Sequence, residues 1–156
     1  MKLSALLTPE LVVHPLRATD KWDVIRQITR AAVEAGALPE TRFDTVHDAL
    51  VTREKSMTTG MEHGIAIPHA AVDGIEEVIA ILAIAPDGVP FDTLDGEPAR
   101  IVVGLIIPRE KKLLHIKTLA EIAKLLSREE IRTALVETDS PEQVVAVVRE
   151  RDCEIA

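Results

Sequence analysis

Two uninterrupted apolar runs constrain the fold of this chain more than any other feature. They are Val78–Ala85 and Ile101–Ile107, and both are continuous rather than alternating, which is typical of strands covered on both faces. Each is far shorter than the roughly 20 residues that a membrane-spanning helix needs. A shorter pattern, Gly64–Ile67, alternates isoleucines with small residues, as a half-buried strand would. The sequence therefore predicts a small sheet with buried central strands.

Helical patterns lie on both sides of these strands in the sequence. Apolar spacing predicts helices over about 20–35, 39–53 and 111–126, and Ser127 and Ser140 each open a capping box, with Glu130 and Gln143 respectively, for two further helices. The expected apolar face of the first helix comprises Trp22, Ile25, Ile28 and Val33. Helices before and after the strands would cover both faces of the sheet, which places the chain in the α/β class. No linker or internal repeat is visible, so we expect residues 1–156 to form a single domain.

The charge balance is acidic. Lys and Arg number 18 against 26 Asp and Glu, which gives a formal net charge of −8. A nucleic-acid binder needs a basic surface to displace counterions from phosphates, so we expect no nucleic-acid partner. No signal peptide is evident, and we expect a cytoplasmic protein without direct membrane insertion. Aromatic residues make up 2% of the chain, so the core must consist of aliphatic side chains.

A histidine follows the Gly64–Ile67 pattern directly after a proline. Pro68 cannot donate to a sheet ladder and biases Ile67 toward an extended conformation, so the strand is predicted to stop there with His69 at its end. An imidazole with an ordinary pKa of about 6.5 is mostly unprotonated at neutral pH and can act as a nucleophile or general base. A solvated histidine without chemical function would show the same local pattern.

Two other histidines have alternative interpretations. His115 precedes Leu119, Ile122 and Leu126 at helical spacing, which places it on an inward apolar face, where a core histidine bonded to a backbone carbonyl is the simpler interpretation. His63 could join His69 and His115 in a three-histidine metal site. No histidine pair occurs at i, i+4 on one helix, so we expect no metal and no other cofactor.

Three motifs resemble one protein family. Thr59-Gly60, three further residues and Gly64-Ile65-Ala66-Ile67-Pro68-His69 resemble the phosphorylation-site motif of the enzyme IIA domains of the bacterial sugar phosphotransferase system, in the fructose/mannitol class that includes the nitrogen-regulatory IIA proteins. The segment His115–Leu126 is similar to the helix that carries the second active-site histidine of the family, and Arg53-Glu54 matches its Arg-Glu pair. The resemblance covers roughly Leu3 to Arg149 and implies a three-layer α/β/α sandwich around a small mixed β-sheet.

The resemblance implies a role for each matched residue. His69 would accept the phosphoryl group, through Nε2, and His115 would orient His69 or hydrogen-bond the phosphoryl group. Arg53 would stabilise the phosphoryl charge, although an arginine at a helix C-terminus can also simply complement the helix dipole. The loop of Thr58, Thr59 and Gly60 would offer N–H groups and hydroxyls as a nest for the dianion.

The implied activity is that of a phosphotransferase component. The donor would be an HPr-type phosphocarrier protein, and phosphate would pass to a separate IIB component or serve as a signal to regulatory protein targets. Docking of a donor requires an apolar surface around His69. Glu62 and His63 stand where the family usually has glycine and asparagine, and a carboxylate near an incoming dianion favours a second hypothesis, an interaction module with the same fold that transfers no phosphate.

Overall fold

The computed structural model describes residues 2–154. Its elements in chain order are α1 (Leu3–Leu6), the 3₁₀ turn η1 (Pro9–Leu11), β1 (Val12–Val13), α2 (Lys21–Glu34), the 3₁₀ turn η2 (Glu40–Arg42), α3 (Phe43–Ser56), β2 (Ile65–Ala66), β3 (His69–Val72), β4 (Ile79–Val89), β5 (Ala99–Pro108), α4 (Lys112–Leu126), α5 (Glu129–Val136) and α6 (Pro141–Glu154).

One mixed sheet organises these elements. Its strand order is β1-β4-β5-β2, and β3 also pairs with β5. The long strands β4 and β5 are antiparallel, whereas β1 is parallel to β4, and β2 and β3 are parallel to β5. The two apolar runs are thus the two central strands, as predicted. The short strands β2 and β3 follow one another along the same side of β5, so β3 lies at an edge of the sheet.

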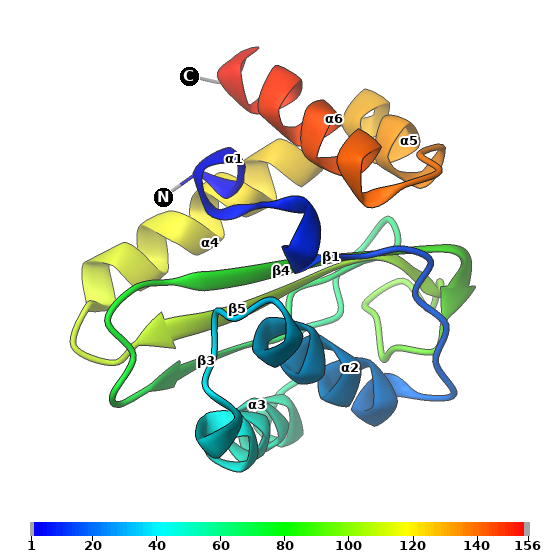
Figure 1. The fold of residues 1–156 in the computed structure, drawn as a ribbon. Coiled ribbons are helices and arrows are strands. Elements are labelled where there is room, and N and C mark those ends of the chain that lie inside the picture. The colour runs from blue at the N-terminus through cyan, green and yellow to red at the C-terminus, as the bar shows by residue number, and fades with distance from the viewer. Residues whose placement is uncertain (1, 155–156) are drawn as a thin grey trace.

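Helices cover both faces of the sheet (Figure 1). Helices α2 and α3 lie on one face, and α1, α4, α5 and α6 lie on the other. The core between the layers is almost entirely Ile, Leu, Val and Ala. The predicted three-layer α/β/α sandwich around a small mixed sheet is confirmed.

The strands differ from prediction at two places. The strand at Gly64–Ile67 does not end the sheet segment at Pro68, because the chain pairs again with β5 from His69 onward, with His69 opposite Leu105. Pro68 only interrupts the ladder, and its carbonyl still accepts from the N–H of Leu105 at 3.0 Å. The first strand, β2, does end before Pro68 as predicted, and His69 begins a further strand, β3. Similarly, the turn-type residues Pro86-Asp87-Gly88 follow the predicted strand Val78–Ala85 but still lie inside β4, where the register against β5 shifts between Ile84 and Val89.

The helices lie where they were predicted, but the roles expected for Trp22 and Ser127 differ in the structure. Asp20 caps α2 by accepting the Asp23 N–H at 2.9 Å, but Trp22 is 38% exposed rather than part of the apolar face. The Ser127 capping box is wrong, because Ser127 is still in a helical conformation and its hydroxyl donates to the Lys124 carbonyl at the end of α4. Ser140 does accept the N–H of Gln143, at 3.2 Å. Within residues 2–154, no helix combines the length and apolar character that membrane crossing requires.

Candidate active site

His69 is held by a hydrogen bond within its own segment. Its Nδ1 lies 2.8 Å from the carbonyl oxygen of Ile67, on the other side of the interrupting Pro68. A carbonyl oxygen only accepts, so Nδ1 carries the proton of the neutral ring and Nε2 keeps its lone pair. The ring is therefore fixed in the tautomer that leaves Nε2 as the nucleophilic atom.

His115 lies beside this ring. It is in the first turn of α4, and its ring centroid is 5.4 Å from that of His69, with an interplanar angle of 75°. The structure thus brings together two histidines that are 46 positions apart in the sequence. His115 is only half-buried, in contrast to the fully buried Ile122 on the same helix, so it lies at the edge of the core rather than inside it.

Arg53 completes this group from the last turn of α3. One guanidinium nitrogen donates to the carbonyl of Met57 at 2.8 Å, which gives a hydrogen-bond partner to a backbone carbonyl at the C-terminal end of α3. The same side chain lines a pocket of about 520 Å³ with His69 and His115. Arg53 can therefore bind the C-terminal end of α3 and also face the pocket, since one N–H group contacts the Met57 carbonyl while the guanidinium lines the pocket with the two histidines.

Burial and positive charge favour the neutral form of both rings. Burial lowers the pKa of His69 most, the bond to the Ile67 carbonyl partly offsets this, and the charges of Arg53 and His115 lower it further. Burial and then Arg53 lower the pKa of His115. Both pKa values fall below 6.5, so at neutral pH both rings are uncharged and the lone pair on Nε2 of His69 is available.

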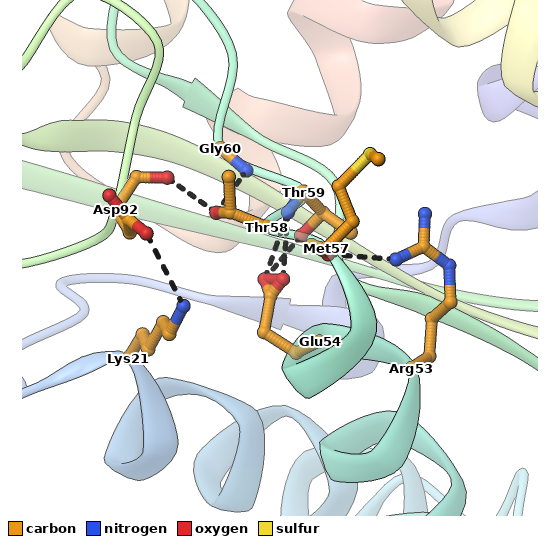
Figure 2. A network of polar contacts seen from close by, with 8 residues as sticks. All are labelled: Lys21, Arg53, Glu54, Met57, Thr58, Thr59, Gly60 and Asp92. Carbon is orange, nitrogen blue, oxygen red and sulfur yellow. Dashed lines mark hydrogen bonds and ion pairs between the residues drawn. The ribbon is translucent and has the colours of Figure 1, made fainter.

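Donors of the threonine–glycine loop have partners within the protein (Figure 2). The Thr59 N–H and hydroxyl both donate to the Glu54 carboxylate, the N–H at 2.7 and 3.1 Å and the hydroxyl at 2.8 Å. The Thr58 hydroxyl donates to the carbonyl of Asp92 and accepts the N–H of Gly60 at 3.1 Å. These contacts hold the loop in place, and the expected contact of Thr58, Thr59 and Gly60 with phosphate stays a prediction.

Glu54 is a residue whose role the sequence analysis did not assign. It is 2% exposed, and its carboxylate fixes the loop through Thr59. The only sequence signal for Glu54 was its place beside Arg53 in the Arg-Glu pair that resembles the family motif. Arg109 was also missed, although it lines the pocket of His69 from the end of β5.

Replacing Glu54 by alanine should destabilise the protein by about 2 kcal/mol, because the N–H and hydroxyl of Thr59 would stay buried without their acceptor. The midpoint of urea unfolding measures this loss. Lys55→Ala, at an exposed position of the same helix turn, is the control and should change stability by less than about 0.5 kcal/mol. Equal midpoints for the two variants would show that the Glu54 contacts contribute nothing.

Glu62 and His63 lie elsewhere. Both are exposed, and both line an apolar pocket of about 290 Å³ that Ile67 and the C-terminal end of α4 also line. Neither lines the pocket of His69, so the expected placement of the Glu62 carboxylate near the incoming dianion is corrected. A three-histidine site is not formed either, and the described residues contain no group of three metal-ligating side chains.

The family model described as "Phosphoenolpyruvate-dependent sugar phosphotransferase system, EIIA 2" matches residues 5–151. The chain belongs to this family. Sequence similarity extends across the EIIA 2 family and includes two kinds of relatives. A nitrogen regulatory protein of Pseudomonas aeruginosa is 32% identical over 148 residues, and a PTS system fructose-specific EIIA component of Haloferax volcanii is 30% identical over 148 residues; each alignment covers 95% of both chains.

A longer relative and two solved structures extend this comparison. The chain is 30% identical over 152 residues to the PTS system fructose-specific EIIABC component of Bacillus subtilis. This alignment covers 97% of the present chain but only 24% of the relative. Nitrogen regulatory protein IIA-Ntr of Neisseria meningitidis superposes with a TM-score of 0.84 at 25% identity, over 94% of this chain and 98% of that one. IIA mannitol of Escherichia coli shares the fold, with a TM-score of 0.77 at 24% identity over 91% and 98%.

Proposed function

We propose that this EIIA 2 chain is a histidine phosphocarrier that accepts a phosphoryl group on Nε2 of His69. The observation that carries the proposal is the bond from Nδ1 to the Ile67 carbonyl, which leaves Nε2 as the free nucleophile in a pocket shared with His115 and Arg53. The donor is an HPr-type phosphocarrier, as family membership implies. We further propose that residues 1–156 act as one domain in the cytoplasm.

The transfer step needs positioning rather than a protein base. The Nε2 lone pair of His69 attacks phosphorus as the N–P bond of the donor phosphohistidine breaks, and the bonding pair leaves with the donor imidazole, whose other nitrogen is protonated. His69 keeps its Nδ1 proton on the Ile67 carbonyl throughout, so it becomes a protonated phosphohistidine. Arg53 and a neutral His115, which donates a hydrogen bond, stabilise the charge on the phosphoryl oxygens.

The direct test is intact mass after incubation with phosphoenolpyruvate, enzyme I and an HPr-type carrier. The expected product carries a single phosphoryl group that acid removes and base leaves in place, because a phosphorus–nitrogen bond is labile when protonated. A chain that gains no phosphoryl group from a cognate donor would refute the proposal.

The lowered pKa of His69 has a consequence for pH dependence. Protonation of Nε2 removes the nucleophile, and burial delays this protonation to a pH below 6.5. The rate of phosphorylation by the small donor phosphoramidate, corrected for the ionisation of the donor, should thus fall to half of its plateau value only at a pH below 6.5. In an NMR titration, Arg53→Gln should raise the pKa of His69, since a neighbouring cation is lost. A His69 midpoint at or above 6.5 in the wild type would contradict the prediction.

The step after phosphorylation has two forms in the relatives. One relative is named a fructose-specific EIIA component and another a nitrogen regulatory protein. We propose that phosphate on His69 either passes to a separate IIB component or regulates protein targets through its presence. The alternative of a module that transfers no phosphate rested on a carboxylate beside His69, and Glu62 does not line that pocket.

A further inference from the structure

A second pocket lies beside the segment that leads to His69, where Glu62 and His63 depart from the family motif. Its volume is about 290 Å³, almost twice the roughly 150 Å³ of an apolar cavity that binds benzene. Apart from Glu62, His63 and Ser127, the lining is apolar and consists of Met61, Ile65, Ile67, Leu94, Ala123 and Leu126. We call it the Ile67 pocket, and it has room for an aromatic ring with a short aliphatic chain.

Part of this lining is fixed, but one apolar residue is uncovered. The N–H of Met61 donates to the Ile65 carbonyl at 2.8 Å, and Ile65 is buried. Leu94, in contrast, is 72% exposed, and its turn between β4 and β5 is tied to the pocket because the N–H of His63 donates to Asp95 at 3.0 Å. A ligand in the pocket would take Leu94 out of water, and a fixed lining needs little reorganisation to bind it.

Glu62 determines the charge of the Ile67 pocket. Among the described residues that line it, Glu62 is the only carboxylate, and there is no Lys or Arg. Its carboxylate lies 3.8 Å from Nε2 of His63, a contact that is an ion pair only when His63 is protonated. Since Glu62 is exposed, its carboxylate lies at the edge of the pocket. An apolar pocket with one carboxylate at its edge fits a ligand with an apolar body and a single ammonium group.

The basic residues near His63 belong to a different pocket. Arg100 and Arg132 line a cavity of about 380 Å³ that shares only His63 with the lining of the Ile67 pocket. Glu129 and Glu137 line the same cavity, so the formal charges of its arginines and glutamates cancel. An anionic ligand therefore gains no net attraction from this cavity, whereas the carboxylate of the Ile67 pocket repels it.

We propose that the Ile67 pocket binds a small primary amine with an arylalkyl or alkyl body, and that this ligand acts on His69. Ile67 connects the two sites, because its side chain lines the pocket and its carbonyl lies 2.8 Å from Nδ1 of His69. A ligand packed against Ile67 restricts the motion of this carbonyl and thus the orientation of the His69 ring. The binding site is independent of the proposed function, and its effect on phosphorylation rests on that function.

Three probes with the same apolar body test the ligand class: phenylbutylamine, phenylbutanol and phenylbutyrate. Dissociation constants for the full chain are measured by NMR titration of backbone amides at low salt and about pH 8, where an aliphatic ammonium is charged and an ordinary histidine is not. The variants are Glu62→Gln, at an exposed position, and Ala123→Phe, which fills the pocket from a half-buried position on α4. Glu142→Gln, at an exposed position on α6, is the matched control.

The amine should bind with a Kd on the order of 1 mM, as expected for a ligand of this size. It should bind about threefold more tightly than the alcohol and about tenfold more tightly than the carboxylate, since its partner is an exposed charge. In Glu62→Gln the three affinities should converge, and Glu142→Gln should behave as the wild type. Ala123→Phe should bind none of the probes.

The effect on His69 is measured from its amide signal, from that of Ile67, and from the rate of phosphorylation by phosphoramidate. Saturating amine should shift both signals and raise the rate about twofold or more, because a fixed Ile67 carbonyl keeps a larger fraction of His69 rings in the attacking orientation. The rate in Ala123→Phe should not respond to the amine. A bound amine that leaves the wild-type rate unchanged would overturn the effect on His69.

Other outcomes would overturn the site or its ligand class. Absence of binding by any probe, or normal binding to a folded Ala123→Phe, would overturn the site. Tighter binding of the carboxylate than of the amine, or unchanged discrimination in Glu62→Gln, would overturn the ligand class, and this comparison decides even if Ala123→Phe does not fold. Ile67 signals that shift with protein concentration alone would assign the pocket to a second copy of the chain instead. Absence of a phosphoryl adduct from every donor would refute the proposed function while amine binding persists.

Discussion

A chain in which His69 is replaced by alanine is expected to take up no phosphoryl group from any donor. We proposed the Nε2 lone pair as the nucleophile, and neither Arg53 nor a neutral His115 should substitute for it, because the bond from Nδ1 to the Ile67 carbonyl holds only the ring of His69 in this orientation. Intact mass after incubation with phosphoenolpyruvate, enzyme I and an HPr-type carrier measures the result. The variant should fold normally, since the ring is only half-buried and β3 keeps its pairing with β5.

His115→Ala is the matched comparison, because it removes the second ring of the same edge-on pair. Its proposed role is orientation and charge stabilisation, so slow transfer should remain, with the adduct still on His69. Removing a single donor of this kind typically costs about 10²–10³ in rate. Normal phosphorylation of His69→Ala would sink the assignment of the acceptor, and complete inactivity of His115→Ala would make it more than an orienting residue.

Replacing Gly60 by alanine is expected to cause the largest loss of stability of any change in the loop. A Cβ at this position would overlap the carbonyl oxygen of Asp92 and lie 2.8 Å from the Asp92 carbonyl carbon and from Thr93 Cα. All of these are backbone atoms, so no side-chain rotation relieves the overlap. The loop would have to leave Asp92, which also breaks the hydrogen bond from Thr58. We expect about 3 kcal/mol of destabilisation, at the upper end for overpacking.

Gly96→Ala is the control for this prediction. An added Cβ there meets no atom within 4 Å, and only its φ of +77° opposes the substitution, at a cost of about 1 kcal/mol. Urea unfolding of the two variants, together with their rates of phosphorylation, separates steric overlap from backbone strain. Similar stabilities for the two variants would show that Gly60 does not pack against Asp92.

Local patterns in the sequence were sufficient for most of the fold. Continuous apolar character identified the central strands β4 and β5, because burial on both faces leaves no polar alternation. Asp20 caps α2 and Gly36, with φ +77°, follows its end, which agrees with the helix predicted over about 20–35. Errors arose where a local signal competed with pairing. Pro68 interrupts the ladder without ending it, since the neighbouring residues still find β5.

For the candidate site, the sequence predicted which residues come together but not the contacts that they make. The matched motifs identified His69, His115 and Arg53, and the structure places all three around one pocket. The use of the loop donors was not predictable, because the partner of the Thr58 hydroxyl is Asp92, 34 positions away in the sequence. The location of Glu62 was likewise hidden, since a positive φ of 65° at His63 redirects the chain toward another cavity.

The exposed position of Trp22 gives the protein an optical probe. The chain has one tryptophan and no tyrosine. The ammonium of Lys21 lies 5.0 Å from the centroid of the Trp22 ring and 3.9 Å from the carboxylate of Asp92. The backbone carbonyl of Asp92 in turn accepts a hydrogen bond from the Thr58 hydroxyl (Figure 2). Trp22 emission therefore reports on the surroundings of the threonine–glycine loop instead of the aliphatic core. Loop displacement in a donor complex, or in Gly60→Ala, can accordingly be followed by fluorescence on unlabelled protein.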